Sequence, residues 1–227
     1  MSNIILLVLC FTAGILLRRG RVMPDNAPAV LNTFIIYISV PALALLYIHD
    51  LTFSGDTVLV VLMAWLYFAL AAVFFLAVSR YFKFSRGTTG ALILTGGLGN
   101  TAFFGLPMIE AYWGHDGIAT GILIDQTGSF MAISTVGIVV AGIYSNDKPS
   151  VSSIVINILK FPPFIAMMAA FMLLPVAYPD WLVAVLKRLG DTLAPLAMLS
   201  VGMQLRLGQV WGNCCSLIIG LTFKLLL

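Results

Sequence analysis

Charged residues are scarce in this chain. Lys, Arg, Asp and Glu together make up 9% of its 227 residues, whereas they make up about 25% of a soluble globular protein. Hydrophobic residues make up 61% of the chain, and its mean hydropathy is +1.06. These proportions exclude an ordinary soluble domain and predict an all-α polytopic membrane protein. The net charge of +3 belongs to the loops between apolar segments, so it implies no nucleic-acid partner.

Cysteine and histidine are also rare. The three cysteines, Cys10, Cys214 and Cys215, lie in apolar segments without metal-ligand spacing. The two histidines, His49 and His115, fall in predicted loops. No histidine therefore lies within a span at useful spacing from a Ser, Cys or carboxylate. The sequence therefore argues against a serine or metal-dependent membrane enzyme, and we expect no enzymatic activity, no metal and no cofactor.

Long apolar runs divide the chain into eight predicted membrane-spanning segments. They cover approximately residues 3–19, 28–48, 57–79, 88–110, 117–144, 153–175, 180–204 and 209–227. The connections are brief and leave no room for a soluble domain. Residues 1–9 carry no Lys or Arg, so the first run is predicted to be a retained span and not a secretory signal.

Basic residues favour one side of this arrangement. Alternate loops place on one side Arg18, Arg19, Arg21, Arg80, Lys83, Arg86, Lys148 and Arg206. The other side holds His49, Asp50, Asp56, Glu110, His115, Asp116 and Asp180. The positive-inside rule makes the first side cytoplasmic and puts the N-terminus outside. We expect a cell membrane location, either the plasma membrane or a bacterial inner membrane.

A weak internal repeat relates the two ends of the chain. The segment around Pro41 in the second span aligns with the segment around Pro195 in the seventh. This predicts a first repeat of five spans over residues 1–148 and a partial second repeat of three spans over 149–227. An odd number of spans makes the two repeats inverted. A complete second repeat needs two more spans after Leu227, so we expect a truncated chain with eight of ten spans.

The fourth predicted span contains a break. Its helix is interrupted by Gly96, Gly97, Gly99, Gly105 and Pro107, and such residues disfavour a continuous helix. In lipid, irregular backbone persists only where protein buries it or where it lines a watery cavity. Asn100 places a polar side chain at this break, an arrangement that is typical of transporter substrate sites.

The same residues resemble a known family. Asn100-Thr101 followed by Gly105 and Pro107 resembles the Asn-Thr-x-x-x-Gly-x-Pro pattern of the auxin efflux carriers, which include plant PIN carriers and bacterial carboxylate permeases. Val40-Pro41-Ala42-Leu43 and the segment 194–203 support this, and the resemblance covers all 227 residues by span order. It implies two inverted five-span repeats, broken fourth and ninth spans that cross at the substrate site, and an elevator-type movement. Plant carriers have Pro immediately before the Asn, where this chain has Gly99.

Five residues are predicted to bind substrate. Asn100 would donate from its amide to a carboxylate, beside N–H groups freed by the break and the positive end of the following half-helix. Thr101 would add a hydroxyl and an amide, and Gly99, Gln126 and Ser39 complete the set. For Asn100, a structural interhelical hydrogen bond is the alternative.

Asp125 is the candidate for proton or ion coupling, because a carboxylate within a span is expensive to bury. A structural cap on a neighbouring broken helix is the alternative for this residue. The predicted crossover and kink positions are Gly105, Pro107, Pro41 and Pro195.

An intramembrane aspartyl protease using Asp125 and Asp191 is the competing class. That family needs Gly-x-Gly-Asp, and Arg188 stands where the first Gly belongs. We expect Asp191 to pair with Lys187 or Arg188. A second alternative is a truncated carrier fragment that does not transport.

The sequence thus predicts a secondary transporter of a small organic anion. The resemblance implies a carboxylate such as malate or malonate, or an auxin-like acid, moved by efflux or exchange. The expected partners are this anion, the lipid bilayer, a coupling H⁺ or Na⁺, and a second copy of the chain in a homodimer.

Overall fold

The computed structural model describes residues 2–48, 55–145, 150–205 and 214–226. Within these ranges the chain forms helices joined by turns and short extended links, without any strand. The predicted all-α class is therefore confirmed. Predictions that involve His49, Asp50, Lys148 and Arg206 lie outside the described residues.

The first helices match the first two predicted spans. α1 covers Ser2–Arg19, and α2 (Ala27–Phe34) continues through a π-helical turn, η1 (Ile35–Ser39), into α3 (Val40–Ile48). Pro28 occupies the first turn of α2, where its missing N–H has no intrahelical partner to lose. Pro41 lies just after η1. Because proline cannot donate to the carbonyl four residues before it, a widened turn is physically reasonable at this point.

The middle of the chain contains the longest helix and the broken one. α4 covers Gly55–Phe82 and α5 covers Arg86–Gly97, with the Ser85 side chain accepting a 3.2 Å hydrogen bond from the Thr88 amide to cap α5. The following elements are η2 (Thr101–Gly105), α6 (Leu106–Trp113), η3 (His115–Gly117), α7 (Ile118–Leu123), η4 (Ile124–Phe130), η5 (Ile133–Gly137) and α8 (Ile138–Ser145). η2, η4 and η5 are π-helical, and η3 is a short 3-10 turn.

The last predicted spans contain more breaks than expected. They hold α9 (Val151–Leu159), α10 (Pro162–Met172), α11 (Asp180–Gly190), α12 (Leu193–Gln204) and α13 (Cys214–Leu226). The predicted span 153–175 divides before Pro162-Pro163, which together lack two N–H donors. The predicted span 180–204 divides at the turn Asp191-Thr192.

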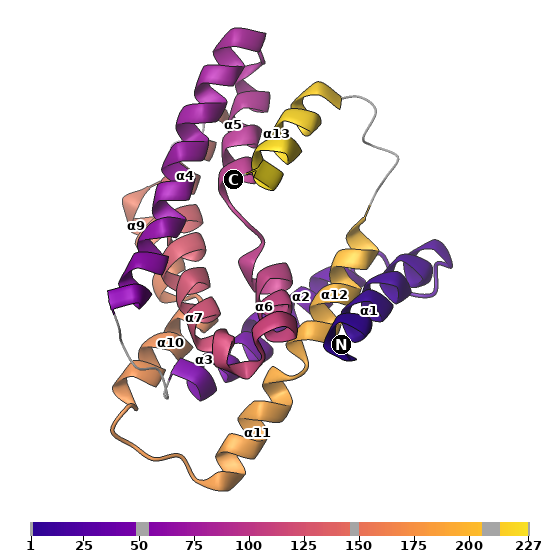
Figure 1. The fold of residues 1–227 in the computed structure, drawn as a ribbon, viewed down its shortest axis with the longest axis vertical. Coiled ribbons are helices and arrows are strands. Elements are labelled where there is room, and N and C mark those ends of the chain that lie inside the picture. Colours follow the sequence, from indigo (N-terminus) through magenta and orange to yellow (C-terminus); the bar gives the residue numbers. More distant parts are fainter. Residues whose placement is uncertain (1, 49–54, 146–149, 206–213, 227) are drawn as a thin grey trace. The chain divides into compact units, whose positions relative to one another are not determined.

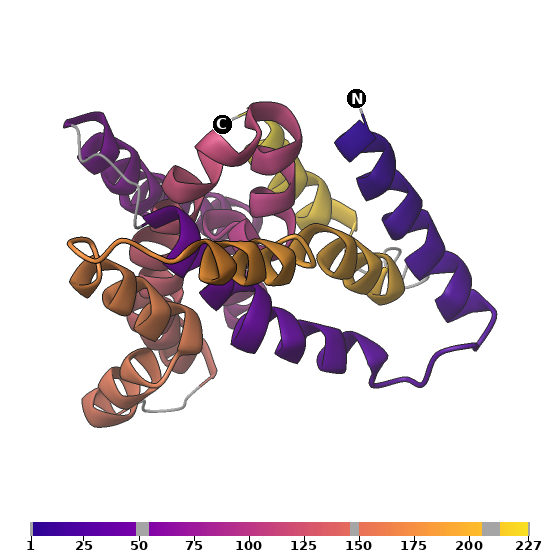
Figure 2. The same cartoon turned by 90° about the horizontal axis from the view of Figure 1, so that it is seen from below.

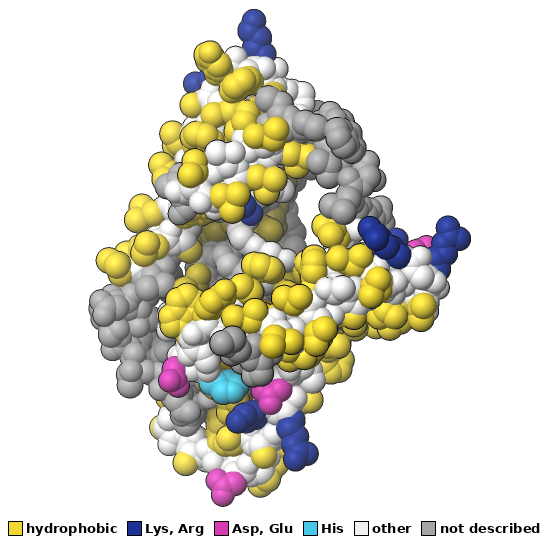
Figure 3. Space-filling view, turned by 45° about the vertical axis from the view of Figure 1, so that its right-hand side comes forward, with side chains coloured by type: hydrophobic (Ala, Val, Ile, Leu, Met, Phe, Trp, Pro, Cys, Tyr) yellow, Lys and Arg dark blue, Asp and Glu magenta, His cyan; other side chains and the backbone are white. Residues whose placement is uncertain are grey.

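Long apolar helices identify the chain as an integral membrane protein. Four described stretches are long and apolar enough to cross a membrane, namely 27–48, 62–82, 86–113 and 115–144, and two shorter apolar helices lie at 162–172 and 216–226. Large apolar side chains such as Leu66 and Val73 are 67% and 65% exposed. Figure 3 shows hydrophobic side chains over much of one face, with charged groups at a few places. Such a surface suits contact with lipid chains.

The described helices form two compact units that do not follow chain order. The first unit comprises residues 1–53, 100–126 and 160–205, and the second comprises 54–99, 127–159 and 206–227. This division concerns compactness, and the predicted repeats over 1–148 and 149–227 remain a prediction. In the first unit α3 packs against α7, α10 and α11, and α1 lies beside α12 (Figures 1 and 2).

Each unit has its own apolar core. The core of the first unit is built from η1, α3, α6, α7, α10 and α12, and includes Ile35, Ile48, Leu106, Ile122, Met167 and Leu193. In the second unit Phe75 is fully buried and packs against Phe223 of α13, with ring centroids 4.9 Å apart. Gly96 of α5 faces Phe75, where an added side chain would clash, and Gly97 faces Phe68, where an added Cβ would be tightly packed.

Candidate functional site

A break in the helix lies where the glycines and Pro107 predict it. α5 ends at Gly97, and Leu98 has an extended backbone with φ −115° and ψ 133°. Asn100 has φ −85° and ψ 74°, and a new helical stretch begins at Thr101 and runs through α6 to Trp113. Pro107 is buried in α6 directly after the π-helical turn η2, and such a widened turn accommodates the N–H that proline lacks. At Gly105 an added Cβ would meet only ordinary contacts at 3.7 Å, so sterics alone do not require glycine there.

Asn100 caps the helical stretch that follows the break. Its Oδ1 accepts a hydrogen bond from the Phe103 amide at 3.2 Å. Its backbone carbonyl accepts from the amides of Phe104 and Gly105 at 3.2 and 3.0 Å. The Asn100 Nδ2 and the amides of Thr101 and Ala102 donate to no group in the described residues. Because Asn100 is exposed, these donors and the positive helix end can receive an anion.

A buried carboxylate lies directly beside this helix start. The Thr101 hydroxyl donates to Asp125 Oδ1, and Gln126 Nε2 donates to Asp125 Oδ2 at 2.6 Å. Asp125 and Gln126, both in η4, are 6% and 0% exposed. The predicted residues Thr101, Asp125 and Gln126 therefore form one hydrogen-bonded group, which ties η2 to η4.

Gln126 carries an orphan acceptor. Its Oε1 is buried and has no hydrogen-bond partner among the described residues. An unpaired buried amide oxygen costs about 1–3 kcal/mol, so such a group is expected to acquire a donor or a cation in a working state. This keeps Gln126 a candidate for ligand contact.

Ser39 belongs to a different contact. Its buried hydroxyl lies 2.8 Å from that of Thr192, just before α12, and it makes no hydrogen bond to Asn100, Asp125 or Gln126 in the described part of the chain. Pro41 lies in α3 and Pro195 in the first turn of α12. α12 also packs against η2, so Pro195 is on an element that contacts the broken helix.

A buried polar group on α12 was not foreseen. Ser200 of α12 is fully buried, and its hydroxyl donates to Asn32 Oδ1 of α2 at 2.6 Å and receives a hydrogen bond from Gln204 Nε2 at 3.1 Å. The available signal was the presence of three polar side chains within otherwise apolar spans. The one-turn spacing of Ser200 and Gln204 puts both on the same helix face.

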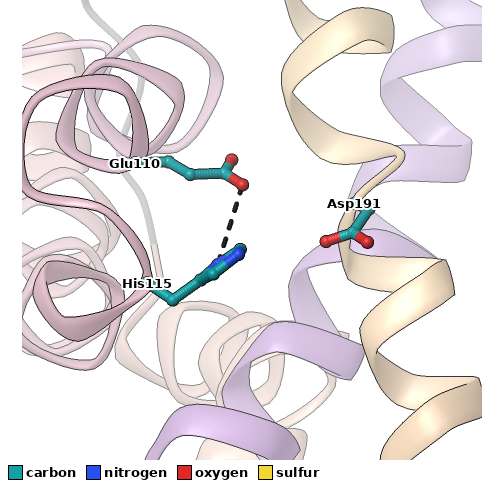
Figure 4. Close-up of side chains that lie close together, drawn as sticks. All are labelled: Glu110, His115 and Asp191. Atoms are coloured by element: carbon teal, nitrogen blue, oxygen red, sulfur yellow. Dashed lines mark ion pairs between the residues drawn. The ribbon is translucent and has the colours of Figure 1, made fainter. Parts of the chain in front are cut away.

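The prediction for Asp191 is wrong. No ion pair joins Asp191 to Lys187 or Arg188 in the structure, although all three residues are described. Its carboxylate lies instead near Glu110 and His115, and the three side chains converge (Figure 4).

The two aspartates of the protease hypothesis have different partners. Asp125 bonds to Thr101 and Gln126, whereas Asp191 lies with Glu110 and His115. An aspartyl protease dyad requires two carboxylates that share one proton at about 3 Å. The described residues do not form that arrangement with Asp125 and Asp191.

Comparison with known proteins finds a family match and a curated relative, and both cover nearly all of this chain. The model of a family described as "Membrane transport protein" matches residues 1–226. A curated protein of Methanocaldococcus jannaschii, described as an uncharacterized transporter, is 25% identical over 233 residues, which cover 96% of this chain and 74% of that protein.

Proposed function

Because the chain belongs to the membrane transport protein family, in agreement with its resemblance to the auxin efflux carriers, we propose that it is a secondary transporter of a small organic anion. The substrate class is a carboxylate such as malate or malonate, or an auxin-like acid. The observation that carries this proposal is the set of N–H donors at the helix break, on Asn100, Thr101 and Ala102, which have no acceptor among the described residues.

The chemistry of these donors favours an anion over a cation or a sugar. A helix N-terminus carries a partial positive charge, and its unpaired amides point outward along the axis. A carboxylate accepts several such hydrogen bonds at once, and each is stronger than a bond between neutral groups. Broken helices whose half-helix N-termini point at substrate carboxylates are a recurring design in transporters. In the proposed cycle an elevator-type movement carries this site across the membrane.

The proposal is tested by transport with the purified full chain in liposomes. Loaded vesicles should accumulate radiolabelled malate, malonate or indole-3-acetate by exchange, and excess unlabelled anion should compete. Glucose serves as the uncharged control and should not accumulate above empty vesicles. Absence of exchange with all three acids would overturn the assigned substrate class.

Asp125 is proposed to couple proton binding to anion binding. When ionised, its carboxylate puts a negative charge beside the helix start that receives the substrate, because it accepts the Thr101 hydroxyl bond. Like charges placed side by side repel, and because Asp125 is buried its charge is only weakly screened by water. A proton on Asp125 removes this repulsion, so anion affinity should rise as the pH falls.

We predict that Asp125→Asn removes this pH dependence. The amide keeps the shape of the side chain and stays neutral at every pH, so the variant should bind the anion at neutral pH as the wild type does at acid pH. Anion affinity measured between about pH 5 and 8 is the readout, with Asp116→Asn on the exposed η3 turn as the matched control. If the anion affinity of Asp125→Asn depends on pH as that of the wild type does, Asp125 is not the coupling group. If the anion affinity of the wild type depends on the Na⁺ concentration and that of Asp125→Asn does not, Asp125 couples Na⁺ instead.

The remaining assignments complete the proposal. A cell-membrane location with the N-terminus outside follows from the basic residues near Arg18 and Arg80, and a homodimer is the proposed assembly. Accessibility of a single introduced cysteine at residue 2 to a membrane-impermeant thiol reagent in intact cells tests the orientation. Labelling only after cell lysis would reverse it.

A further inference from the structure

We propose that Glu110, His115 and Asp191 bind a divalent transition-metal ion of the Zn²⁺ type. The three side chains come from three separate elements of the first unit, namely α6, η3 and the turn between α11 and α12. One potential ligand atom from each lies within 4.8 Å of the other two. Figure 4 shows the side chains converging on one space from facing sides.

The histidine ring is held by a residue outside the set. Tyr47 Oη of α3 lies 2.8 Å from His115 Nδ1, and the two rings stack with centroids 5.7 Å apart and planes 12° apart. Metal-binding histidines typically donate their second ring N–H to an acceptor, which fixes the tautomer and the ring plane. In the tautomer in which Nδ1–H donates to the Tyr47 oxygen, the Nε2 lone pair is available for a metal.

The carboxylates of Glu110 and Asp191 have no Lys or Arg counter-ion among the described residues. Two carboxylates from different elements lie close together, and neither forms an ion pair with a Lys or Arg among the described residues. Lys187 and Arg188, one turn before Asp191, are not within ion-pair distance of it. Among the described residues, the ionic contact of this cluster is the one between Glu110 Oε1 and His115 Nδ1, at 3.8 Å. A dication would neutralise the two carboxylates, which otherwise repel.

The donor set selects the type of metal. One imidazole and two carboxylates suit Zn²⁺ and similar ions, whereas Mg²⁺ and Ca²⁺ prefer oxygen ligands alone. Tetrahedral zinc holds its ligands at about 2.0–2.2 Å, so the three atoms must approach one another by about an ångström from their present positions. Asp191 is exposed, so rotation of its side chain can provide this movement while Tyr47 holds the His115 ring.

A bound metal would link parts of the first unit that are distant in sequence. Glu110 lies on α6, in the helical stretch that begins at Thr101, and Asp191 precedes α12. Metal binding should therefore restrain this stretch against α12 and raise the stability of the protein. The inference does not depend on the identity of the transported substrate.

The test is direct metal binding by the purified full chain, freed of any polyhistidine tag and stripped of metal. Isothermal titration with Zn²⁺ should give one site per chain, and Mg²⁺ and Ca²⁺ should bind at least 100-fold more weakly. The Co²⁺ form should show visible absorption of a nitrogen and oxygen site without the intense charge-transfer band of thiolate ligands. That band would assign the metal to cysteine and overturn the proposal.

The zinc affinities of substituted proteins distinguish the metal ligands from residues that only lie nearby. His115→Ala and the double variant Glu110→Gln, Asp191→Asn should each lose zinc binding by 100-fold or more, while Asp116→Asn, which removes an adjacent exposed carboxylate, should leave it unchanged. Tyr47→Phe removes only the orienting oxygen and should weaken binding by about 10–100-fold. His115→Gln serves where the alanine variant does not fold. Equal zinc affinity in wild type and the His115 variants overturns the proposal.

Discussion

Replacing Asn100 with Ala is expected to weaken substrate binding by about 10- to 100-fold and to abolish measurable transport. Hydrogen bonds to a charged group contribute about 1.5–3 kcal/mol, and the proposed substrate loses the bond from Asn100 Nδ2. The variant should still insert and fold. It loses the cap that Asn100 Oδ1 provides for the Phe103 amide, and such a cap contributes about 0.5–2 kcal/mol to the free energy of unfolding. Binding of labelled malate or malonate to detergent-purified protein measures the effect.

A second substitution distinguishes a substrate contact from a structural cap. Asn100→Asp keeps an oxygen that can accept from the Phe103 amide, but it removes the donor and adds a negative charge. If Asn100 contacts the anion, this variant should fold as well as the wild type and bind substrate less well than Asn100→Ala does. If Asn100 acts only as a cap, Asn100→Asp should behave like the wild type. That second result would remove Asn100 from the substrate site.

The helix positions were largely predictable because a lipid environment allows few backbone conformations. A span must satisfy its backbone internally, so apolar length identifies helices such as α4 without knowledge of tertiary contacts. Glycines and Pro107 located the break before Thr101 for the same local reason. The π-helical turn at residues 124–130 was not predictable, since nothing in the composition of this segment distinguishes a widened turn from an α-helical one.

Part of the candidate site was predictable and part was not. Asp125 and Gln126 were selected because polar side chains within a span need partners, and the structure gives them a shared partner group with Thr101. Ser39 was selected by the same reasoning, but its partner is Thr192. The cluster of Glu110, His115 and Asp191 depends on how three segments pack. Residues that look like ordinary loop charges along the chain meet only in the folded unit.

Replacing Gly202 is expected to produce the largest loss of stability. Gly202 of α12 lies against Gly14 of α1, and small residues allow membrane helices to approach closely. A Cβ at Gly202 would lie 2.2 Å from the Phe11 carbonyl oxygen, and a Cβ at Gly14 would lie 2.3 Å from that of Leu199. Both obstacles are backbone atoms, which a rotamer change cannot move. The two helices must therefore separate, which weakens the contacts of Leu7 with Ala194 and Met198.

Gly202→Val should lower the free energy of unfolding by about 3 kcal/mol, at the upper end of the range for overpacked cores. For a protein of this size that corresponds to a fall of about 6–12 °C in the melting temperature, measured by circular dichroism in detergent. Gly87→Ala is the control, because a Cβ at Gly87 in the first turn of α5 meets no atom within 4 Å. That variant should unfold at or slightly above the wild-type temperature. Equal melting temperatures for Gly202→Val and the wild type would show that α1 and α12 do not approach as closely as Gly14 and Gly202 permit.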